Sequence, residues 1–316
     1  MDICLTQYQD ALDYLFARVS GGWKLGLDTT RALLRALDDP HQRFPAFHVA
    51  GTNGKGSVVS TMDALLRAGG FRVGRYTSPH LIDFRERICV NDVPIPEQAV
   101  VEFIERWTPE VERLGATFFE ATTCMAFDYF AREMVDVAVV EVGLGGRLDS
   151  TNVITPLATG ISSIGLDHMQ YLGETLEDIA HEKAGIFKPM VPAVIGEESD
   201  DIRALLSTLA RRAGASPVVE IGGDWIVRDI AVDASGTSFT LMADGSARAL
   251  RTPLVGRHQA ANTATAIAML SCAGHAYRAA ADAAEQTLAA VRIPGRFQRC
   301  GRVIFDVAHN PASIAV

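Results

Sequence analysis

A glycine-rich segment at the end of an apolar run is the first candidate for chemistry in this 316-residue sequence. The segment GTNGKGS begins at Gly51, and the apolar residues that follow it recur at helical spacing. Its three glycines would let backbone N–H groups curl around phosphate oxygens at the N-terminus of a helix, where negative charge is favoured. Lys55 would then reach the β and γ phosphates, and the Ser57 hydroxyl would bind Mg²⁺. Because the spacing differs from the standard G-x-x-x-x-G-K-[ST], a glycine-rich turn without a ligand is the alternative.

Polar side chains also stand at or near the ends of three other apolar runs that we predict to be strands. They are Ser78, Glu141 and His168. Ligands of open α/β sheets bind in the crevice at the carboxyl ends of the strands, so we expect these residues to meet there. A carboxylate inside an apolar run needs a cation, and Mg²⁺ would satisfy Glu141. The alternatives are an ion pair of Glu141 with Arg147 or another base, a hydrogen-bonded loop histidine for His168, and a simple Ser-Pro turn for Ser78.

Lys183 lies in the segment TLEDIAHEKAGIFKP, which we predict to be a helix that ends near Gly185 and Pro189. Its position four residues after Ile179 and seven after Leu176 places it on the apolar stripe, so we expect the amine to point inward. Burial lowers the proton affinity of lysine. A neutral amine could act as a nucleophile, form a Schiff base or capture CO₂ as a carbamate, and spacing alone does not choose among these. A snorkelling or ion-paired lysine is the alternative.

These residues require a scaffold in which short apolar strands alternate with helices. Such alternation predicts an α/β fold with a mostly parallel sheet covered by helices on both faces. The predicted helices are 6–19, 28–38, 57–68, 96–114, 119–133, 174–187, 200–213, 258–272 and 277–291. The predicted strands are 45–50, 71–77, 136–142, 157–164 and 191–196. We also expect a hairpin within 87–95 and a small antiparallel patch within 216–252.

A new strand begins at 302, after the break at Pro294-Gly295. A lone strand with few following residues cannot bury its faces, so we expect a second α/β domain that the sequence only begins. The predicted domains are 1–293, which binds ATP, and 294–316, a linker and the first strand of a truncated C-terminal domain.

The composition excludes several classes of function. Net charge is −9 and no basic face is evident, which argues against nucleic acid or an anionic membrane as partner. The five cysteines are scattered and odd in number, as in proteins that keep their thiols reduced. No signal peptide or membrane-spanning run is evident. We therefore expect a cytoplasmic protein, with a monomer as the default.

The sequence closely resembles the folylpolyglutamate/dihydrofolate synthase family, relatives of the Mur peptide ligases. The resemblance is carried by HVAGTNGKGS, TSPHLIDFRERICVND, TFFEATT, VVEVGLGGRLDSTN, SIGLDHMQYLG, LEDIAHEKAGIFK, GRHQAANTATA, IPGRFQ and FDVAHNP. These stretches recur in family order from residue 48 to 311 and together are very specific. The small departures are GLGGRLDSTN for the family's GLGGRxDATN, and Asn91-Asp92 where Asn-Gly is usual.

The resemblance implies roles residue by residue. The ATP phosphate loop is matched by Gly54, Lys55, Gly56 and Ser57. Metal ligands are matched by Ser57, Ser78, Glu141 and His168, where two Mg²⁺ ions are expected and a monovalent cation has room. Lys183 matches a lysine carried as a carbamate, which selects one of the three reactions left open above. With Lys55 and His168, it forms the expected catalytic set.

Further matches concern the nucleotide and the acceptor. Contacts with ATP from the interdomain side are implied for Asn262, Arg296, Asp306 and His309. A pterin-side pocket is implied for Leu27, Asp28, Thr117 and Leu148, with Lys183 also near substrate.

The implied activity is an ATP-dependent amide ligase that joins L-glutamate to dihydropteroate or folate through an acyl phosphate. A Mur-type ligase for UDP-muramoyl substrates, a kinase or ATPase with a phosphate loop, and a nucleotide-binding fragment without turnover are the alternatives. The substrates expected on the first interpretation are ATP, L-glutamate and dihydropteroate or folate.

Overall fold

A computed structural model describes residues 7–19, 26–308, 310 and 314. Its α-helices are α1 (Tyr8–Phe16), α2 (Asp28–Ala36), α3 (Lys55–Ala68), α4 (Glu97–Leu114), α5 (Phe118–Arg132), α6 (Met169–Leu172), α7 (Leu176–Ala184), α8 (Asp200–Arg212), α9 (His258–Cys272), α10 (His275–Asp282) and α11 (Ala284–Thr287). Short 3₁₀ helices are η1 (Pro40–Gln42), η2 (Phe84–Arg87), η3 (Ser150–Val153) and η4 (Leu288–Ala290). None of the helices in these ranges combines the length and hydropathy that crossing a membrane requires.

The main sheet has eight strands in the described residues, in the order β4-β3-β2-β5-β1-β6-β7-β8. They are β1 (Ala46–Ala50), β2 (Val73–Tyr76), β3 (Ile88–Val90), β4 (Val93–Pro94), β5 (Val137–Glu141), β6 (Ala158–Ile161), β7 (Ala193–Ile195) and β8 (Val218–Glu220). Strands β2, β5, β1, β6, β7 and β8 are parallel, and β3 and β4 add an antiparallel edge. The predicted α/β class and the hairpin at Asn91-Asp92 are therefore confirmed.

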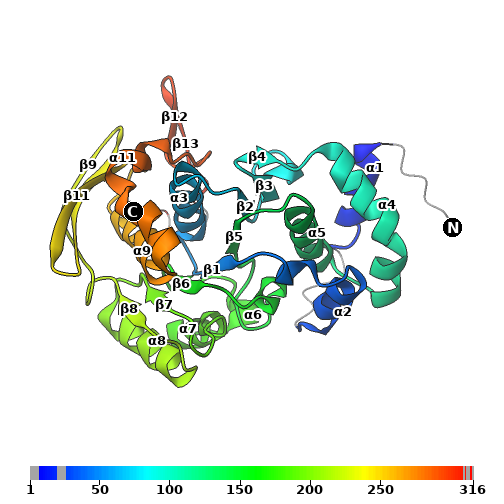
Figure 1. Ribbon diagram of the computed structural model, residues 1–316, viewed down its shortest axis with the longest axis horizontal. Coiled ribbons are helices and arrows are strands. Elements are labelled where there is room, and N and C mark those ends of the chain that lie inside the picture. Colours follow the sequence, from blue (N-terminus) through cyan, green and yellow to red (C-terminus); the bar gives the residue numbers. More distant parts are fainter. Residues whose placement is uncertain (1–6, 20–25, 309, 311–313, 315–316) are drawn as a thin grey trace.

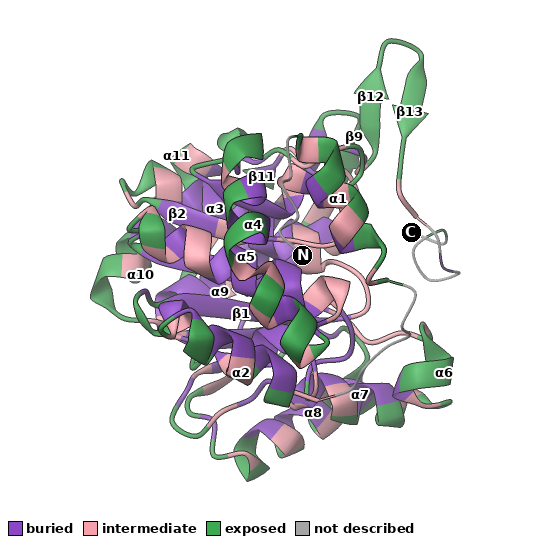
Figure 2. Cartoon of the chain, turned by 90° about the vertical axis from the view of Figure 1, so that its right-hand side faces the viewer, coloured by how far each residue is buried: buried purple, intermediate pink, exposed green. Residues whose placement is uncertain are grey.

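Helices cover both faces of the sheet (Figure 1). One face packs on α3 and α9, whose apolar residues join those of β1 and β5 in one core cluster. The other face packs on α1, α2, α4 and α5, and a further cluster lies under α7 and α8. The central strands are buried throughout, as Figure 2 shows for β1. Because β1 is flanked by β5 and β6, its carboxyl end opens at the centre of the sheet, where ligands of such folds bind.

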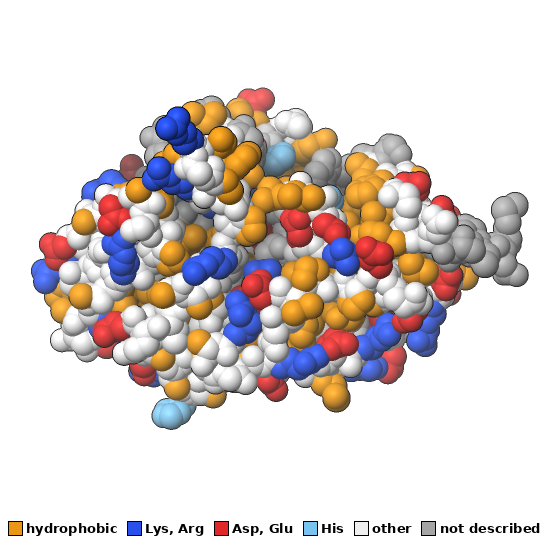
Figure 3. Space-filling model, turned by 90° about the horizontal axis from the view of Figure 1, so that it is seen from above, with side chains coloured by type: hydrophobic (Ala, Val, Ile, Leu, Met, Phe, Trp, Pro, Cys, Tyr) orange, Lys and Arg blue, Asp and Glu red, His pale blue; other side chains and the backbone are white. Residues whose placement is uncertain are grey.

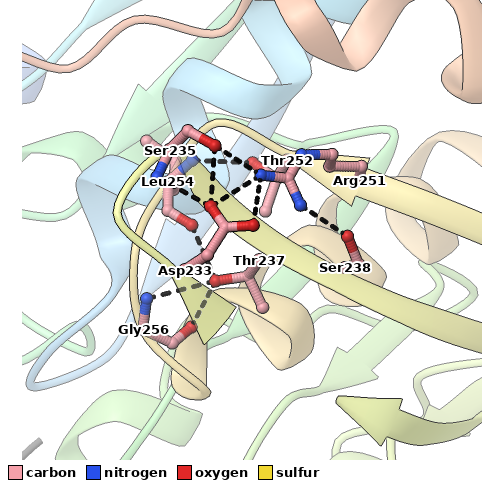
Figure 4. Close-up of polar contacts among 8 residues, drawn as sticks. All are labelled: Asp233, Ser235, Thr237, Ser238, Arg251, Thr252, Leu254 and Gly256. Atoms are coloured by element: carbon pink, nitrogen blue, oxygen red, sulfur yellow. Dashed lines mark hydrogen bonds and ion pairs between the residues drawn. The ribbon is translucent and has the colours of Figure 1, made fainter. Parts of the chain in front are cut away.

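A second sheet contains β9 (Ile226–Asp233), β10 (Gly236–Ala243) and β11 (Ser246–Thr252), all antiparallel. Its polar contacts tie it to the loop before α9 (Figure 4). The Asp233 carboxylate accepts hydrogen bonds from Arg251 and Ser235, while the Thr237 hydroxyl donates to the Leu254 carbonyl at 2.8 Å. Arg251 and Ser235 hold the pKa of Asp233 well below its usual range. The contacts of Thr237 with Leu254 and Gly256 hold the loop that leads into α9.

Two predicted elements differ from the structure, and a third is present with a partner strand that was not predicted. The predicted antiparallel patch 216–252 is wrong at its start, because β8 pairs in parallel with β7 after the α8 crossover. The predicted helix 277–291 is divided at Ala283, whose ψ of 4° leaves the helical range, and the chain turns so that Leu288 and Val291 reach the core. The predicted strand at 302 is β13 (Val303–Phe305), and it pairs with β12 (Gln298–Cys300).

The β12–β13 hairpin protrudes from the body and its strands are exposed (Figure 2). No pairing joins it to the main sheet in the described ranges. The expectation that residues 294–316 begin a second domain stays a prediction.

Candidate active site

The phosphate loop runs from β1 into α3, and its backbone requires glycine at two positions. Gly51 has φ +149°, and a Cβ there would lie 2.0 Å from Oγ of Ser162. Gly54 has φ +87°, and a Cβ there would lie 2.4 Å from Oδ1 of Asn262. Both positions favour glycine because of the backbone angle and because a neighbouring polar side chain fills the space. The loop is therefore closely packed against β6 on one side and α9 on the other.

Two serines after β6 hold the phosphate loop in place, and the sequence analysis did not identify them. The Ser162 hydroxyl donates to the Asn53 carbonyl at 2.6 Å. The Ser163 hydroxyl accepts from the Asn53 N–H at 3.2 Å, and the Thr52 N–H donates to the Ser163 carbonyl at 2.7 Å. Their position at the carboxyl end of a parallel strand was the available signal, the same one that selected Ser78.

The amine of Lys55 folds back onto the loop that carries it. Its Nζ donates to the carbonyls of Gly51 at 3.0 Å and Thr52 at 3.1 Å. Burial lowers the pKa of Lys55, and the nearby Glu141 carboxylate opposes that change. Ser57, two residues further on, is buried in the first turn of α3.

Lys183 points inward from α7, as the spacing predicted. The helix begins with a capping box in which Thr175 accepts from the Asp178 N–H and the Asp178 carboxylate accepts from the Thr175 N–H. The Lys183 side chain is only 5% exposed, and its Nζ donates to the Gly51 carbonyl at 2.9 Å. Burial, together with the positive charge of Lys55, lowers the pKa of Lys183 to about 7. The alternative of a snorkelling lysine is wrong.

Glu141 ends β5 and is 5% exposed. Its Oε2 accepts a hydrogen bond from the Ser78 N–H at 3.3 Å, so two of the predicted strand-end residues meet. Burial raises the pKa of Glu141, while Lys55 counteracts the rise. The alternative ion pair with Arg147 is wrong, because Arg147 lies at the surface and contacts Glu182 at 2.8 Å.

His168 lies before α6 with a left-handed φ of +50°. Its side chain is 46% exposed, and its Nε2 lies 3.8 Å from Oδ1 of Asp167. Asp167 is also one of the charges that raise the pKa of both Lys55 and Lys183, which places the Asp167-His168 pair on the phosphate-loop side of the sheet. Within the described ranges, no three acidic, cysteine or histidine side chains gather as a metal cluster.

A cavity of about 700 Å³ adjoins the phosphate loop and is lined by Gly54, Ser57, Asn262, Arg296 and Asp306 among others. It brings together residues from α3, α9 and the segment after α11. Figure 3 looks onto this side of the molecule, where hydrophobic side chains gather on either side of a hollow. The Asp306 carboxylate accepts from the Phe297 N–H at 2.7 Å and so closes the base of the hairpin. His309, predicted to contact ATP, lies outside the described residues.

Asn310 joins the C-terminal segment to the phosphate loop. Its side-chain amide exchanges two hydrogen bonds with that of Asn53, at 3.1 and 3.3 Å. It also donates to Oδ2 of Asp167 at 3.1 Å, and it is buried. The sequence analysis gave no role to Asn310 or to Asp167, although each adjoins a histidine that it selected.

The four residues predicted for the acceptor pocket have different surroundings. Thr117 caps α5, where its hydroxyl accepts from the Glu120 N–H at 3.3 Å. Asp28 is exposed in the first turn of α2, and Leu27 and Leu148 are half-buried. No bound group tests this part of the prediction.

Comparison with known proteins gives the family. The family described as the Mur ligase middle domain matches residues 49–270. The chain belongs to the Mur ligase family. Within it, the relatives are folate enzymes: the dihydrofolate synthase/folylpolyglutamate synthase of Bacillus subtilis is 40% identical over 83% of this chain and 63% of its own length. The folylpolyglutamate synthase of Lacticaseibacillus casei is 37% identical over 89% of this chain and 69% of its own length.

Solved structures of this Mur ligase branch share the fold. The structure titled "E.coli FolC in complex with DHPP and ADP" superposes with a TM-score of 0.85 at 34% identity, covering 98% of this chain and 72% of that one. The chain therefore spans about 63% of the length of the B. subtilis relative and 69% of that of the L. casei relative.

Proposed function

We propose that this chain carries the ATP-binding and phosphoryl-transfer site of a ligase that joins L-glutamate to dihydropteroate or a folate. The observation that carries the proposal is the meeting of three buried or partly buried charges at the end of β1. Lys55 and Lys183 both donate to the Gly51 carbonyl, and Glu141 attracts Lys55. The named activities of the B. subtilis and L. casei relatives, and the DHPP and ADP in the E. coli structure, support the choice of substrates.

The reaction must overcome the poor electrophilicity of a carboxylate. We propose that an acceptor carboxylate oxygen attacks the γ-phosphorus of ATP, the bond to ADP breaks and an acyl phosphate forms. The glutamate amine then attacks the acyl carbon, loses a proton and expels phosphate with the carboxylate's former oxygen. Positioning and charge neutralisation dominate such phosphoryl transfers.

The phosphate loop and the adjoining cavity fit the nucleotide. The start of α3 borders the cavity at Gly54 and Ser57, and a helix N-terminus favours phosphate. We assign Gly54, Lys55, Gly56 and Ser57 to the phosphates, and Asn262, Arg296, Asp306 and His309 to the remainder of ATP. Because Arg296 also opposes the raised pKa of Glu141, it adds positive charge at the mouth of the site.

The donor set fits Mg²⁺, which prefers oxygen ligands. Ser57 and Ser78 offer hydroxyls, Glu141 offers a buried carboxylate and His168 an imidazole. Among these, Glu141 carries the test of fit, because burial disfavours its charge and its pKa stays raised although Lys55, the Ser78 N–H, Arg296 and Arg87 all oppose the rise. When bound, the metal ions would neutralise phosphate charge.

Lys183 fits a carbamate. Carbamate formation needs a neutral amine, and the pKa of about 7 leaves a substantial neutral fraction at neutral pH. A carbamate on Lys183 would place negative charge beside Lys55 and the Asp167-His168 pair. Labelled bicarbonate should give a carbamate carbon signal by NMR in the wild-type chain. Lys183→Ala should lack that signal, and a signal of equal strength in the variant would contradict this assignment.

We assign the pterin side of the acceptor to the region of Thr117, Leu27, Asp28 and Leu148. Thr117 and the aromatic residues after it lie at the start of α5, beside the end of the sheet that carries Glu141. On this assignment, the pterin would bind near α5, and the acceptor carboxylate would point past Glu141 toward Lys55.

Product analysis tests the proposed function. Mass spectrometry of mixtures of dihydropteroate or tetrahydrofolate with Mg-ATP and glutamate should show an amide product heavier by one glutamyl residue, together with ADP. A phosphoester product would indicate a kinase, and free phosphate without amide would indicate an ATPase. Either result would overturn the proposal, and so would an activity confined to UDP-muramoyl substrates.

A further inference from the structure

Arg87 is a buried charge without a counter-ion in the described part of the chain. It ends η2, just before the edge strand β3, and is 8% exposed. No carboxylate oxygen of the described residues lies within 4 Å of its guanidinium, in contrast to Arg75, which is also poorly exposed and lies 2.8 Å from Asp92. Its one side-chain hydrogen bond there runs from Nε to Nδ1 of His80, at 2.8 Å.

The two terminal nitrogens of this guanidinium are not among the fully enclosed unpaired atoms of the described residues, so an anion can reach them from solvent. Such an anion would compensate the solvation that a largely buried charge loses. Burial lowers the pKa of Arg87, but guanidinium groups remain charged in proteins. The two terminal nitrogens, which can bind a carboxylate in a bidentate manner, have no acceptor within hydrogen-bond distance among the described residues.

The guanidinium is nevertheless held in one orientation. Its carbon lies 5.2 Å from the centre of the Phe118 ring, and the Nε–His80 bond fixes the plane. His80 in turn packs edge-on against Phe84 and is tilted against Phe16. The Nδ1 of His80 thus accepts the Arg87 Nε–H from a ring that is itself held by aromatic contacts. The side chain is positioned for a ligand before any ligand binds.

Arg87 also lies at the reacting end of the sheet. Its carbonyl accepts from the Thr77 N–H at 3.0 Å, and the next residue, Ser78, donates to Glu141. Glu141 attracts both Arg87 and Lys55, so the acid lies within electrostatic reach of each. An anion bound to Arg87 would therefore lie next to the aromatic surface of Phe118, on the side of the sheet where Ser78 meets Glu141.

We propose that Arg87, oriented by His80, binds the carboxylate of the acceptor and presents it to the phosphoryl group. This inference rests on the proposed function and identifies a residue to which the family resemblance gave no role. A planar fork of donors can bind a carboxylate in a bidentate manner, and the adjacent Phe118 ring offers apolar contact to the group that carries that carboxylate. The residue contacts substrate, and His80 is its positioning residue.

The test compares pteroate with pteroate amide, in which the carboxylate is neutral, in the presence of ADP and Mg²⁺. Titration calorimetry on the wild-type chain should show that pteroate binds about 10- to 100-fold more tightly than the amide. Arg87→Gln should lose most of this preference while its affinity for ADP changes less than about twofold. Arg87→Lys should retain part of it, since the charge remains but the fork is lost.

Arg106→Gln is the matched control, because Arg106 also lies over an aromatic ring, Trp107, but is exposed on α4. It should keep the full preference for pteroate. An Arg87→Gln variant that melts like the wild type and still prefers pteroate by the same factor would overturn the inference. A wild-type chain that binds ADP but neither pteroate nor its amide would overturn the proposed function instead.

Discussion

The side-chain amines of Lys55 and Lys183 contact the same acceptor, the carbonyl oxygen of Gly51, at 3.0 and 2.9 Å. Two ammonium groups this close would repel each other, which is part of the reason that the pKa of Lys183 falls to about 7. The contact also links α7 directly to the phosphate loop. A change in the charge of one lysine must therefore shift the pKa of the other.

The stability of the chain should depend on pH through Lys183. Its pKa is about 7 in the folded protein and near its usual 10.5 when unfolded, so the unfolded chain binds more protons between these values. The free energy of unfolding should therefore contain a penalty from Lys183 that is full below pH 7 and vanishes as pH rises to 10.5. Lys183→Met removes the penalty and should raise the melting temperature at pH 6, with the gain shrinking by pH 10.

Lys188→Met is the control for this experiment, because Lys188 is less buried and should give a smaller pH dependence. A melting-temperature difference between Lys183→Met and wild type that stays constant from pH 6 to pH 10 would contradict the lowered pKa of Lys183.

Gly54→Ala should weaken nucleotide binding through Asn262. The added Cβ would lie 2.4 Å from Oδ1 of Asn262, so the asparagine must move away from the cavity. Gly70→Ala has the same φ of +87° but meets no atom within 4 Å. Both changes should destabilise the fold by about 1–2 kcal/mol. Only Gly54→Ala should also weaken ADP binding, by about tenfold or more. Equal ADP affinities of the two variants would refute the assignment of this contact to the nucleotide site.

The amide pair of Asn53 and Asn310 should couple the C-terminal segment to the nucleotide. The two side chains exchange hydrogen bonds, and Asn310 also holds Asp167. In a double-mutant cycle with alanine at each position, ADP affinity should show a coupling of about 1 kcal/mol. Asn310→Asp should cost more than Asn310→Ala, because it places a second carboxylate against Asp167. Strictly additive alanine effects would argue against the coupling.

The sequence predicts the scaffold well, because hydrophobic periodicity determines most of its elements. The strand before Gly51, the helix after it and the inward direction of Lys183 all follow from local spacing. The division of 277–291 does not follow, because alanine favours helix regardless of where the chain must turn to bury Leu288. Strand β8 was assigned to the wrong sheet because a short strand carries no signal of its partner.

The sequence predicted residues of the candidate site only where a polar residue stands at the end of a predicted strand. Glu141 and Ser78 meet as expected. By contrast, Asn53 and Asn310 are separated by 257 positions, and nothing in either local sequence indicates their contact. Arg87 was likewise not identified, because the feature that distinguishes it is the lack of a paired carboxylate among the described residues, which only packing reveals.

The central claim is that the acceptor carboxylate is activated by transfer of the γ-phosphoryl group, and isotope transfer tests it most directly. Pteroate labelled with heavy oxygen in its carboxylate would be incubated with this chain, Mg-ATP and glutamate, and the released phosphate analysed by mass spectrometry. We predict that each phosphate carries one labelled oxygen and that its release requires glutamate. Phosphate without label, or no glutamate-dependent release at all, would contradict the account.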